Sequence, residues 1–336
     1  MKREQLVQTL ELLKHALAKD DTIPVFQCFV FDDGTISAYN DTVGIIAPVD
    51  TNETFAVHGK TFLGIVSNSS AEEVSVNLSN QTADFKLGKT EMTLPFIPKE
   101  DFIFEAPTAG TSMFPFTVSS CNAMKLCLDT VSKDETQRAL QGITIVKDKM
   151  YSCDGDTLTR VQLPNGPKGT IFLPTAFCEA VVNVWDALGM AKGKLGYNDE
   201  WCVADFEDWE IWGRIPQIEN KIDFEKEIKK TIKKEIEYQP VPAGLSDALK
   251  RAGVIAGAES AKTVIAIAKG KMALSTQTHM GEVDDVLAIK GHKEVTATIS
   301  AEHLARAIVN CDRFEVHDNC ILLEKEPDVF MLVSNM

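Results

Sequence analysis

Two aspartates separated by one residue are the part of this sequence best suited to chemistry. Asp154 and Asp156 lie in the run Asp154-Gly155-Asp156-Thr157-Leu158. In phosphoryl transfer by such a pair, one carboxylate attacks phosphorus and the other handles the proton of the leaving group. The motif therefore predicts, as one alternative, a metal-dependent phosphohydrolase using Asp154 and Asp156. The run follows a segment that alternates apolar and polar residues, which is typical of an antiparallel strand, so a polar turn is the favoured interpretation.

The other reactive residue types do not form a recognisable site. The six histidines show no ligand pairing at helical spacing, and none adjoins a serine or cysteine nucleophile in sequence. The eight cysteines are scattered singly and include no CxxC pair, so we interpret them as reduced thiols that pack as small hydrophobic residues. The sequence predicts no catalytic site, no metal site and no cofactor, and we expect the protein not to be an enzyme.

The elements that position any site recur three times along the chain. Residues 29–40, 143–154 and 264–276 each read as a strand, a tight turn and a second strand. When Ile36 is set on Met150 and Met272, the small or aliphatic residues that follow also align. Alternation around a Gly, Lys or Asp turn predicts a half-buried hairpin in each copy.

Each hairpin is framed by amphipathic helices. We expect helices over residues 2–20, 58–67, 119–139, 174–188, 243–253 and 299–311, because apolar residues recur there at a spacing that keeps one face apolar. Each third of the chain then runs helix, strands, helix, strands. A repeat of roughly 110 residues is a domain copied three times, since solenoid periods are about 20 to 50 residues.

Composition is that of an ordinary globular protein. The 336 residues are 44% hydrophobic and 25% charged, and no apolar run approaches the roughly 20 residues of a membrane span. Met1-Lys2-Arg3-Glu4 leads into a charged helix rather than a secretory signal, so we expect a cytoplasmic location with no membrane partner. The net charge of -15 argues against a protein that coats DNA with its outer surface, because phosphate binding depends on Lys and Arg. The expected helices are close to neutral, and the remainder carries the negative charge.

Two connectors separate the copies. Residues 98–116 are rich in Pro, Gly, Ser and Thr, which suits a linker. The second connector lies within residues 218–242, where Lys226, Lys229, Lys230, Lys233 and Lys234 stand among glutamates. We interpret this mixed run as a solvated helix face, and a dedicated nucleic-acid patch is the alternative.

Several local motifs carry a resemblance that covers nearly the whole chain. They are Ile23-Pro24-Val25, residues 137–142 (QRALQG), Cys153-Asp154-Gly155, Arg214-Ile215-Pro216 and the apolar residues 330–336. In this order, and with the threefold pattern, the sequence resembles the beta sliding clamp of bacterial DNA polymerase III. The resemblance rests on the collinear order of these matches along the chain.

The resemblance implies an α+β fold with three tandem copies of a DNA-clamp domain, each with two helices packed on antiparallel sheets, assembling into a ring. The expected domains are residues 1–108, 109–222 and 223–336. The implied function is that of a processivity factor, a head-to-tail homodimer that encircles double-stranded DNA without regard to sequence. Its implied partners are the replicative DNA polymerase and a clamp loader, and tethering them to DNA raises their effective concentration.

The resemblance also implies three sets of site residues. Phosphate contacts in the pore are expected at Lys14, Lys19, Lys60, Lys125, Lys133, Arg138, Lys250, Arg251 and Arg306. A partner-peptide pocket is expected at Leu140, Gly155, Leu158, Pro216, Phe330 and Leu332. Dimer contacts are expected between Phe102 of one chain and Val254 and Ile255 of the other.

The sequence departs from the family pattern at four places. Asp101-Phe102-Ile103 stands where Asp-Phe-Pro is usual after the first domain. Almost no room is left for a strand before the first helix. Asp156 and Thr157 stand where a basic pair is expected, and the segment from Asp223 to Lys234 is longer than the usual connector. These departures indicate a divergent or phage-encoded clamp with its own partner motif.

Overall fold

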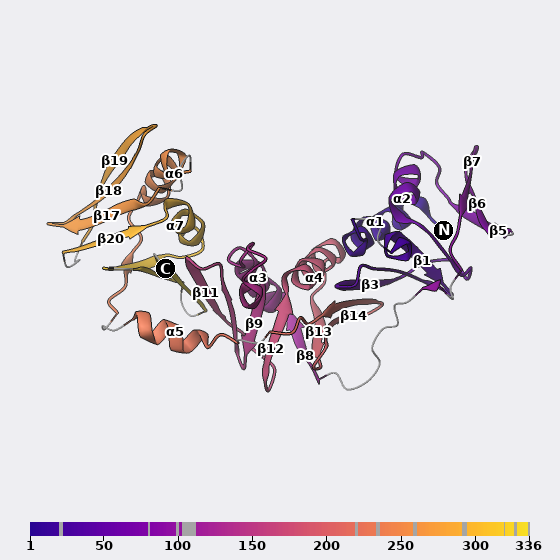
Figure 1. Cartoon of the computed structure of the whole chain (residues 1–336), viewed down its shortest axis with the longest axis horizontal. Coiled ribbons are helices and arrows are strands. Elements are labelled where there is room, and N and C mark those ends of the chain that lie inside the picture. The colour runs from indigo at the N-terminus through magenta and orange to yellow at the C-terminus, as the bar shows by residue number, and fades with distance from the viewer. Residues whose placement is uncertain are drawn as a thin grey trace. The chain divides into compact units, whose positions relative to one another are not determined.

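The computed structural model describes residues 1–19, 23–79, 81–98, 101–102, 112–218, 221–232, 236–257, 261–290, 294–318, 320–325 and 328–334 (Figure 1). The chain divides into two compact units. The first comprises Met1–Cys121 and Leu173–Pro216, and the second comprises Asn122–Phe172 and Gln217–Met336. Each unit combines helices with antiparallel sheets.

The order of elements repeats three times, as the sequence predicts. The first copy contains α1 (Arg3–Leu13), η1 (Lys14–Ala16), η2 (Pro24–Gln27), β1 (Cys28–Asp32), β2 (Thr35–Tyr39), β3 (Val43–Pro48), β4 (Phe55–His58), α2 (Gly59–Ser67), β5 (Ser75–Ser79), β6 (Thr82–Leu87) and β7 (Thr90–Pro95). The second contains β8 (Ser112–Thr117), α3 (Val118–Leu128), η4 (Arg138–Leu140), β9 (Gly142–Val146), β10 (Lys149–Cys153), β11 (Thr157–Gln162), β12 (Thr170–Pro174), α4 (Thr175–Leu188), β13 (Lys192–Tyr197), β14 (Trp201–Phe206) and β15 (Trp209–Arg214). The third contains α5 (Phe224–Thr231), β16 (Gln239–Pro240), α6 (Leu245–Ala256), β17 (Thr263–Ala268), β18 (Lys271–Thr278), β19 (Gly281–Ala288), β20 (Val295–Ile299), α7 (Ala301–Ile308), β21 (Arg313–His317), β22 (Cys320–Lys325) and β23 (Val329–Ser334).

The three predicted hairpins are β1–β2, β9–β10 and β17–β18. Their registers coincide, because Ile36 pairs with Phe31, Met150 with Ile145 and Met272 with Ile267. The sequence alignment of Ile36, Met150 and Met272 is therefore correct, and all three side chains are buried. In each turn a residue with positive φ reverses the chain, at Asp33, Lys147 and Lys269.

Two eight-stranded sheets join strands from different copies. In the first unit the order is β4-β1-β2-β3-β15-β14-β13-β8, where β3 pairs with β15. In the second unit the order is β12-β9-β10-β11-β23-β22-β21-β16, where β11 pairs with β23. A four-stranded sheet (β19-β18-β17-β20) and a three-stranded sheet (β5-β6-β7) complete the fold. Every pairing between named strands is antiparallel among the residues described.

The cores lie between helices and sheets. In the first copy the rings of Phe31 and Phe55 stack with their centroids 4.5 Å apart. The ring centroid of Phe62 on α2 lies 4.7 Å from that of Phe85 on β6. The apolar face predicted for the second helix of each copy is buried, because Phe62, Phe177 and Leu304 are each 0–1% exposed. Burying side chains of this size contributes on the order of 2 kcal/mol each, so these positions anchor the helices.

The predicted helix over residues 119–139 is too long. The structure ends α3 at Leu128, and the Thr130 amide turns back to donate to the Cys127 carbonyl oxygen at 3.0 Å. The Thr130 hydroxyl then bonds the hydroxyls of Ser152 and Thr159 at 2.6 and 2.8 Å. Buried hydroxyls need such partners, and making them removes Thr130 from a helical path.

The strand missing before the first helix is reduced to a single bridge between Lys2 and Glu73. The Met1 ammonium group donates to the Val74 carbonyl oxygen at 3.0 Å. In the other copies the equivalent place holds β8, which pairs with β13, and β16, which pairs with β21. None of the helices described is long and apolar enough to cross a membrane.

Candidate functional site

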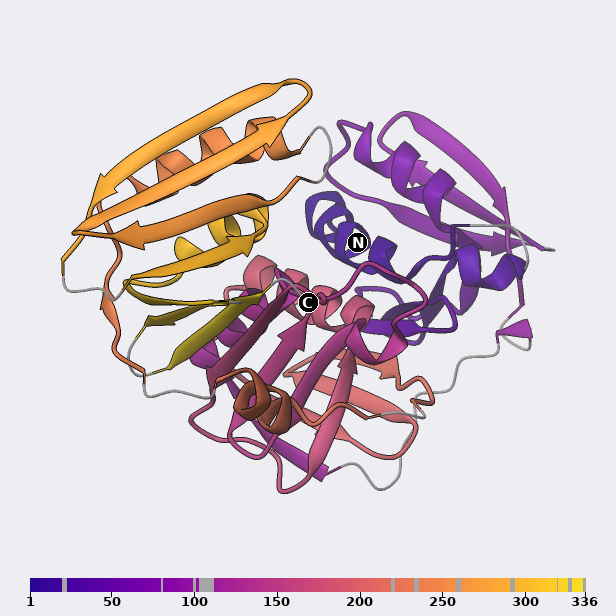
Figure 2. The same cartoon turned by 60° about the vertical axis from the view of Figure 1, so that its left-hand side comes forward.

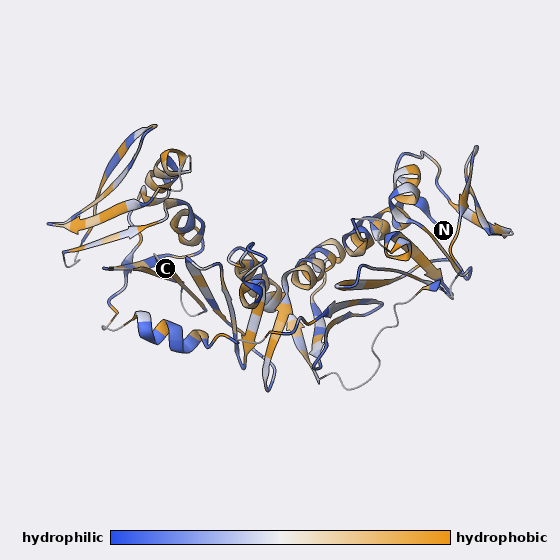
Figure 3. Cartoon of the chain, viewed as in Figure 1, coloured by the Kyte–Doolittle hydropathy of each residue, from blue (hydrophilic) through white to orange (hydrophobic). Residues whose placement is uncertain are grey.

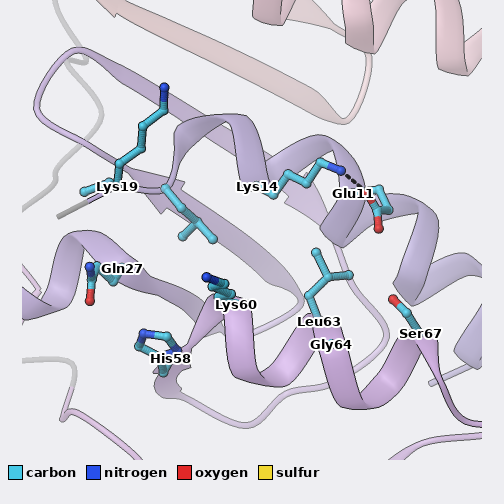
Figure 4. Close-up of a pocket in the computed structure, with 11 residues that line it drawn as sticks. Glu11, Lys14, Lys19, Gln27, His58, Lys60, Leu63, Gly64 and Ser67 are labelled. Atoms are coloured by element: carbon cyan, nitrogen blue, oxygen red, sulfur yellow. Dashed lines mark hydrogen bonds and ion pairs between the residues drawn. The ribbon is translucent and has the colours of Figure 1, made fainter. Parts of the chain in front are cut away.

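Three of the predicted phosphate-binding lysines share one groove. Lys14, Lys19 and Lys60 line a concavity of about 670 Å³ in the first unit, formed by the end of α1, η1 and the start of α2 (Figure 4). All three side chains are exposed. The Lys14 ammonium group pairs with the Glu11 carboxylate, one turn earlier, which partly offsets the positive charge.

The groove has its shape because the two helical segments approach closely. A β-carbon added at Gly59, the first residue of α2, would lie 2.5 Å from a Leu17 methyl group, so the Leu17 side chain would have to move to accept a larger residue there. His58 caps α2, and its Nδ1 atom accepts from the Thr61 amide at 3.3 Å. Because orphan amides at a helix start need acceptors, this contact fixes where α2 begins and hence where Lys60 lies.

The three predicted cations on α6 and α7 are placed differently. The guanidinium group of Arg251 on α6 binds both Asp285 oxygens, at 3.1 and 2.7 Å, and this hydrogen-bonded contact raises the pKa of Arg251. Arg306 on α7 donates to the Asp129 carbonyl oxygen at 3.1 Å and to Asp154 at 3.2 Å. The Lys250 ammonium nitrogen lies 3.8 Å from an Asp247 carboxylate oxygen. A phosphate would have to compete with these partners.

The remaining three cations lie around α3. Lys125 is partly buried on α3 and lines a smaller hollow with Asn310 and Lys325. Lys133 and Arg138 are exposed beyond the end of α3, because that helix stops short of them. The structure therefore brings together only Lys14, Lys19 and Lys60 of the nine.

The paired aspartates form a turn, as the favoured interpretation predicts. One Asp154 carboxylate oxygen accepts from the amides of Asp156 and Thr157 at 3.1 and 2.7 Å. The other Asp154 oxygen binds Arg306, and Asp156 lies 3.3 Å from His303 Nδ1. These contacts occupy both carboxylates with backbone amides and basic side chains, so the structure offers no support for a nucleophilic role.

Four of the six predicted pocket residues gather in one apolar cluster of the second unit. Leu158, Phe330 and Leu332 are buried there, and Leu140 packs against them. Leu158 on β11 is directly opposite Leu332 on β23, which is opposite Leu322 on β22. Opposed residues share a face of a sheet, so these side chains line one continuous apolar face.

The other two predicted pocket residues, Gly155 and Pro216, are not among the side chains that form this cluster. Gly155 is in the Asp154 turn with φ +103, a conformation that requires glycine, and its amide lies 3.4 Å from the Cys153 sulfur. Pro216 ends the first unit, whereas the cluster belongs to the second. The predicted pocket residues that meet are Leu140, Leu158, Phe330 and Leu332. Together with Tyr151, Cys153, Cys320 and Leu322 they form an apolar sheet face that is covered in this structure, and we call this face the β11–β23 groove.

The helix α5 lies on the β11–β23 groove. Phe224 and Ile228 are 5% and 6% exposed and belong to the same cluster, and the Phe224 ring stacks on that of Tyr151 with centroids 5.3 Å apart. Figures 1 and 2 show α5 on the side of the sheet opposite α3 and α7. The interpretation of this connector as a solvated face is therefore incomplete, because one side of the helix is buried. Figure 3 shows α5 as predominantly hydrophilic, which explains the error.

A charged contact holds α5 in place beside the groove. The Glu225 carboxylate accepts from the Tyr151 hydroxyl at 2.6 Å and from Lys149 at 2.9 Å, and it lies 3.6 Å from Arg160. The Tyr151 hydrogen bond is the main cause that lowers the pKa of Glu225, with Lys149 adding to it. The signal that could have revealed this packing is the four-residue spacing of Phe224, Ile228 and Ile232, which marks one face of a helix.

The predicted dimer residues differ in exposure. Val254 on α6 is 78% exposed, which is unusual for an aliphatic side chain, and Ile255 is partly buried. Phe102 is partly buried against the cluster that contains Val25, Phe26 and Trp212. Seven of the eight cysteines are buried and all are free, in agreement with the interpretation as packed thiols. Burial raises the pKa of Cys127 to about 12 and that of Cys153 to about 11.

Comparisons with known proteins give a clear result for structure and none for sequence. No family model matches the chain, and no curated protein matches it. Among solved structures, a putative DNA polymerase III beta subunit of Eubacterium rectale superposes with a TM-score of 0.87 at 13% identity, over 100% of this chain and 98% of that one. The DNA polymerase III beta subunit of Thermotoga maritima superposes with a TM-score of 0.85 at 20% sequence identity, over 99% of this chain and 97% of that one. A DnaN sliding clamp of Bartonella birtlesii superposes with a TM-score of 0.88 at 15% sequence identity, over 99% of this chain and 97% of that one.

The chain therefore has the fold of the DNA polymerase III beta subunits along its whole length. The predicted fold class, an α+β arrangement of three repeated units, is confirmed. The family resemblance inferred from collinear short motifs is confirmed at the level of structure. It was visible in the order of elements although few side chains are shared.

Proposed function

We propose that this protein is a sliding clamp, a non-enzymatic ring that encircles duplex DNA and tethers a replicative polymerase to it. The observation that carries the proposal is the threefold order of elements, with each eight-stranded sheet built from two successive copies. The domains would be residues 1–108, 109–222 and 223–336, although the two compact units cut across the middle copy. Two chains, joined head to tail, would close the ring in the cytoplasm, because a heterologous contact that closes builds rings and not fibres.

The charge distribution supports a pore that contacts phosphates. The net charge of -15 disfavours DNA binding by the surface as a whole, yet Lys14, Lys19 and Lys60 all line one groove beside helices. Contacts with phosphates carry no sequence information, which suits a protein that must move along any DNA. Weak binding is compatible with the task because a closed ring stays on DNA by topology.

Partner proteins would dock on the β11–β23 groove. It is the place where four of the expected pocket residues meet, and an apolar groove captures a few anchors at modest affinity. The polymerase and a clamp loader would share the groove in turn. Dimer contacts would join Phe102 of one chain to Val254 and Ile255 of the other, and Val254, at 78% exposed, is available for such a contact.

The test of the proposal combines solution mass with DNA topology. We expect a mass twice the 37.0 kDa of one chain by sedimentation equilibrium. After loading, the protein should remain on nicked circular DNA through gel filtration and be lost once a restriction enzyme linearises the DNA. A monomer in solution, or equal retention on circular and linear DNA, would contradict encirclement.

A further inference from the structure

The β11–β23 groove already holds a segment of its own chain. The helix α5 lies within the connector whose length departs from the family pattern, and it covers the groove. Ile222, Ile232 and Ile236, on either side of the helix, also pack against the cluster. The covered face includes Leu158 and Leu332, which are only 4% and 2% exposed.

Two apolar anchors account for the fit. Phe224 lies parallel to Tyr151 at an interplanar angle of 8°, and Ile228 follows one helical turn later on the same side. The exposed side of α5 carries Glu227, Lys229 and Lys230. The helix therefore presents to the groove the kind of narrow apolar stripe by which helical peptides dock.

The groove also recognises a carboxylate. One Glu225 carboxylate oxygen is contacted from the neighbouring strands β10 and β11. It lies 2.9 Å from the Lys149 ammonium nitrogen, 2.6 Å from the Tyr151 hydroxyl and 3.6 Å from an Arg160 guanidinium nitrogen. The Arg160 guanidinium group is also fixed over the Phe330 ring, 4.6 Å from its centroid. The two cations and the hydroxyl belong to strands of the sheet and not to α5.

The helix depends on the groove for its own stability. It has eight residues, whereas helices shorter than about 12 to 15 residues are marginal in water. The Asp223 side chain caps it by accepting from the Lys226 amide at 3.1 Å, and acidic and basic residues sit at its favourable ends. These local features help the helix to form, and the groove makes it persist.

We propose that α5 is an internal ligand of the β11–β23 groove, and that partner peptides must displace it. The partner would repeat the pattern of Phe224, Glu225 and Ile228: an aromatic side chain, a carboxylate at the next position and an aliphatic side chain three residues further. This inference rests on the proposed function and goes beyond it, because it specifies the chemistry of the partner segment and a competition that controls access.

The experiment uses a fluorescein-labelled peptide with residues 222–232 of this chain and the full-length protein. Fluorescence anisotropy should give a Kd at least about ten-fold lower for the Phe224→Ala/Ile228→Ala chain than for the wild type, because removing the internal competitor raises the fraction of open grooves. Adding Leu332→Ala to the opened chain should weaken binding again while leaving the solution mass unchanged. Equal Kd values for wild-type and opened chains, or no binding to the opened chain, would overturn the inference.

Replacing one glutamate at a time in the peptide tests whether the contact of Glu225 with Lys149, Tyr151 and Arg160 contributes to binding. Glu225→Gln in the peptide should weaken binding to the opened chain about ten-fold, since a charge-assisted hydrogen bond is lost. Glu227→Gln changes the same charge on the exposed side and should leave the Kd unchanged. Equal effects of the two changes would show that binding is not directed by Lys149, Tyr151 and Arg160.

A second route covers the case in which the double alanine chain fails to fold. Glu225→Gln in the full chain keeps the apolar packing and should lower the peptide Kd several-fold and speed hydrogen exchange of the α5 amides. Glu227→Gln should do neither. If Glu225→Gln leaves both measurements unchanged, α5 does not act as a releasable ligand.

Peptide binding and DNA retention separate the two proposals. Peptide competition is measured on free protein, whereas retention is measured on circular DNA. Loss of retention with intact competition would refute the ring but leave the internal ligand. Retention without competition would refute the internal ligand alone.

Discussion

At the scale of residues, a cluster of buried hydroxyls decides where α3 ends. Thr130, Ser152 and Thr159 are 3%, 0% and 0% exposed, and the Thr130 hydroxyl bonds the other two. Apolar spacing alone favoured a longer helix, because Val131 continues the stripe. The sequence could not show that Thr130 would find partners on strands β10 and β11, which come later in the chain.

Thr130→Val should destabilise the fold by about 1–3 kcal/mol, because it leaves two buried hydroxyls without their partner while keeping the side-chain shape. Urea unfolding followed by circular dichroism measures the loss. Thr136→Val is the control, since Thr136 is exposed and bonds only Asp134 nearby. A loss no larger than that of the control would show that the hydroxyl cluster contributes nothing.

Glu225 gives the attachment of α5 a dependence on pH. Its folded-state pKa lies below the usual value of 4.5, so its contribution is complete above that value and is lost as the pH falls through the folded-state pKa. We expect wild type to melt at a higher temperature than Glu225→Gln at pH 7. The difference should vanish at low pH. Glu227→Gln should show no such convergence, and a constant difference for Glu225→Gln would contradict this account.

At the scale of elements, the hairpins could be predicted and the role of the connector could not. Alternation located β1–β2, β9–β10 and β17–β18 with their register, because period and turn residues are local properties. The spacing of Phe224 and Ile228 marks α5 as amphipathic, but its target is formed by β10, β11, β22 and β23. The spacing of apolar residues within one segment predicts that one face of the helix is buried. It does not predict which other elements that face packs against.

The groove between α1 and α2 predicts a measurable salt effect. Replacing Lys14, Lys19 and Lys60 together with alanine should reduce binding to a short duplex and flatten its dependence on salt. The slope of log K against log salt should decrease by up to about 3, because each phosphate contact contributes about 0.9. Titrations between low and physiological salt, followed by anisotropy of labelled DNA, measure this slope.

A matched triple variant separates local contacts from net charge. Lys89, Lys168 and Lys269 are exposed lysines between strands, and their replacement changes the net charge by the same amount. The slope should then stay near the wild-type value. If both triple variants flatten it equally, the groove has no special part in binding DNA.

At the scale of the whole molecule, the order of elements was predictable and the sheets that join the copies were not. Each copy reads as a separate domain in sequence, yet β3 pairs with β15 and β11 with β23, so each large sheet spans two copies. These pairings join residues far apart in the chain, as Ile45 with Ile211, and no local periodicity reveals them. This is also why the compact units do not coincide with the repeats.

The proposed contact between two chains, which would close the ring, includes Val254 on α6. Val254 is 78% exposed in the single chain, so Val254→Asp should leave its folding intact. In a closed dimer the new carboxylate would be buried among apolar side chains without a partner, which is strongly unfavourable. We expect the dimer Kd to rise at least about a hundred-fold, equivalent to roughly 2.8 kcal/mol, by sedimentation equilibrium.

Val309→Asp is the matched control for this change. Val309 is 66% exposed directly after α7, and it places the same new charge on a different apolar surface residue. This variant should remain a dimer and stay on circular DNA, whereas Val254→Asp should fail at both. If Val309→Asp dissociates the chains and Val254→Asp does not, two subunits meet through a different surface, and the proposed closure through α6 is wrong.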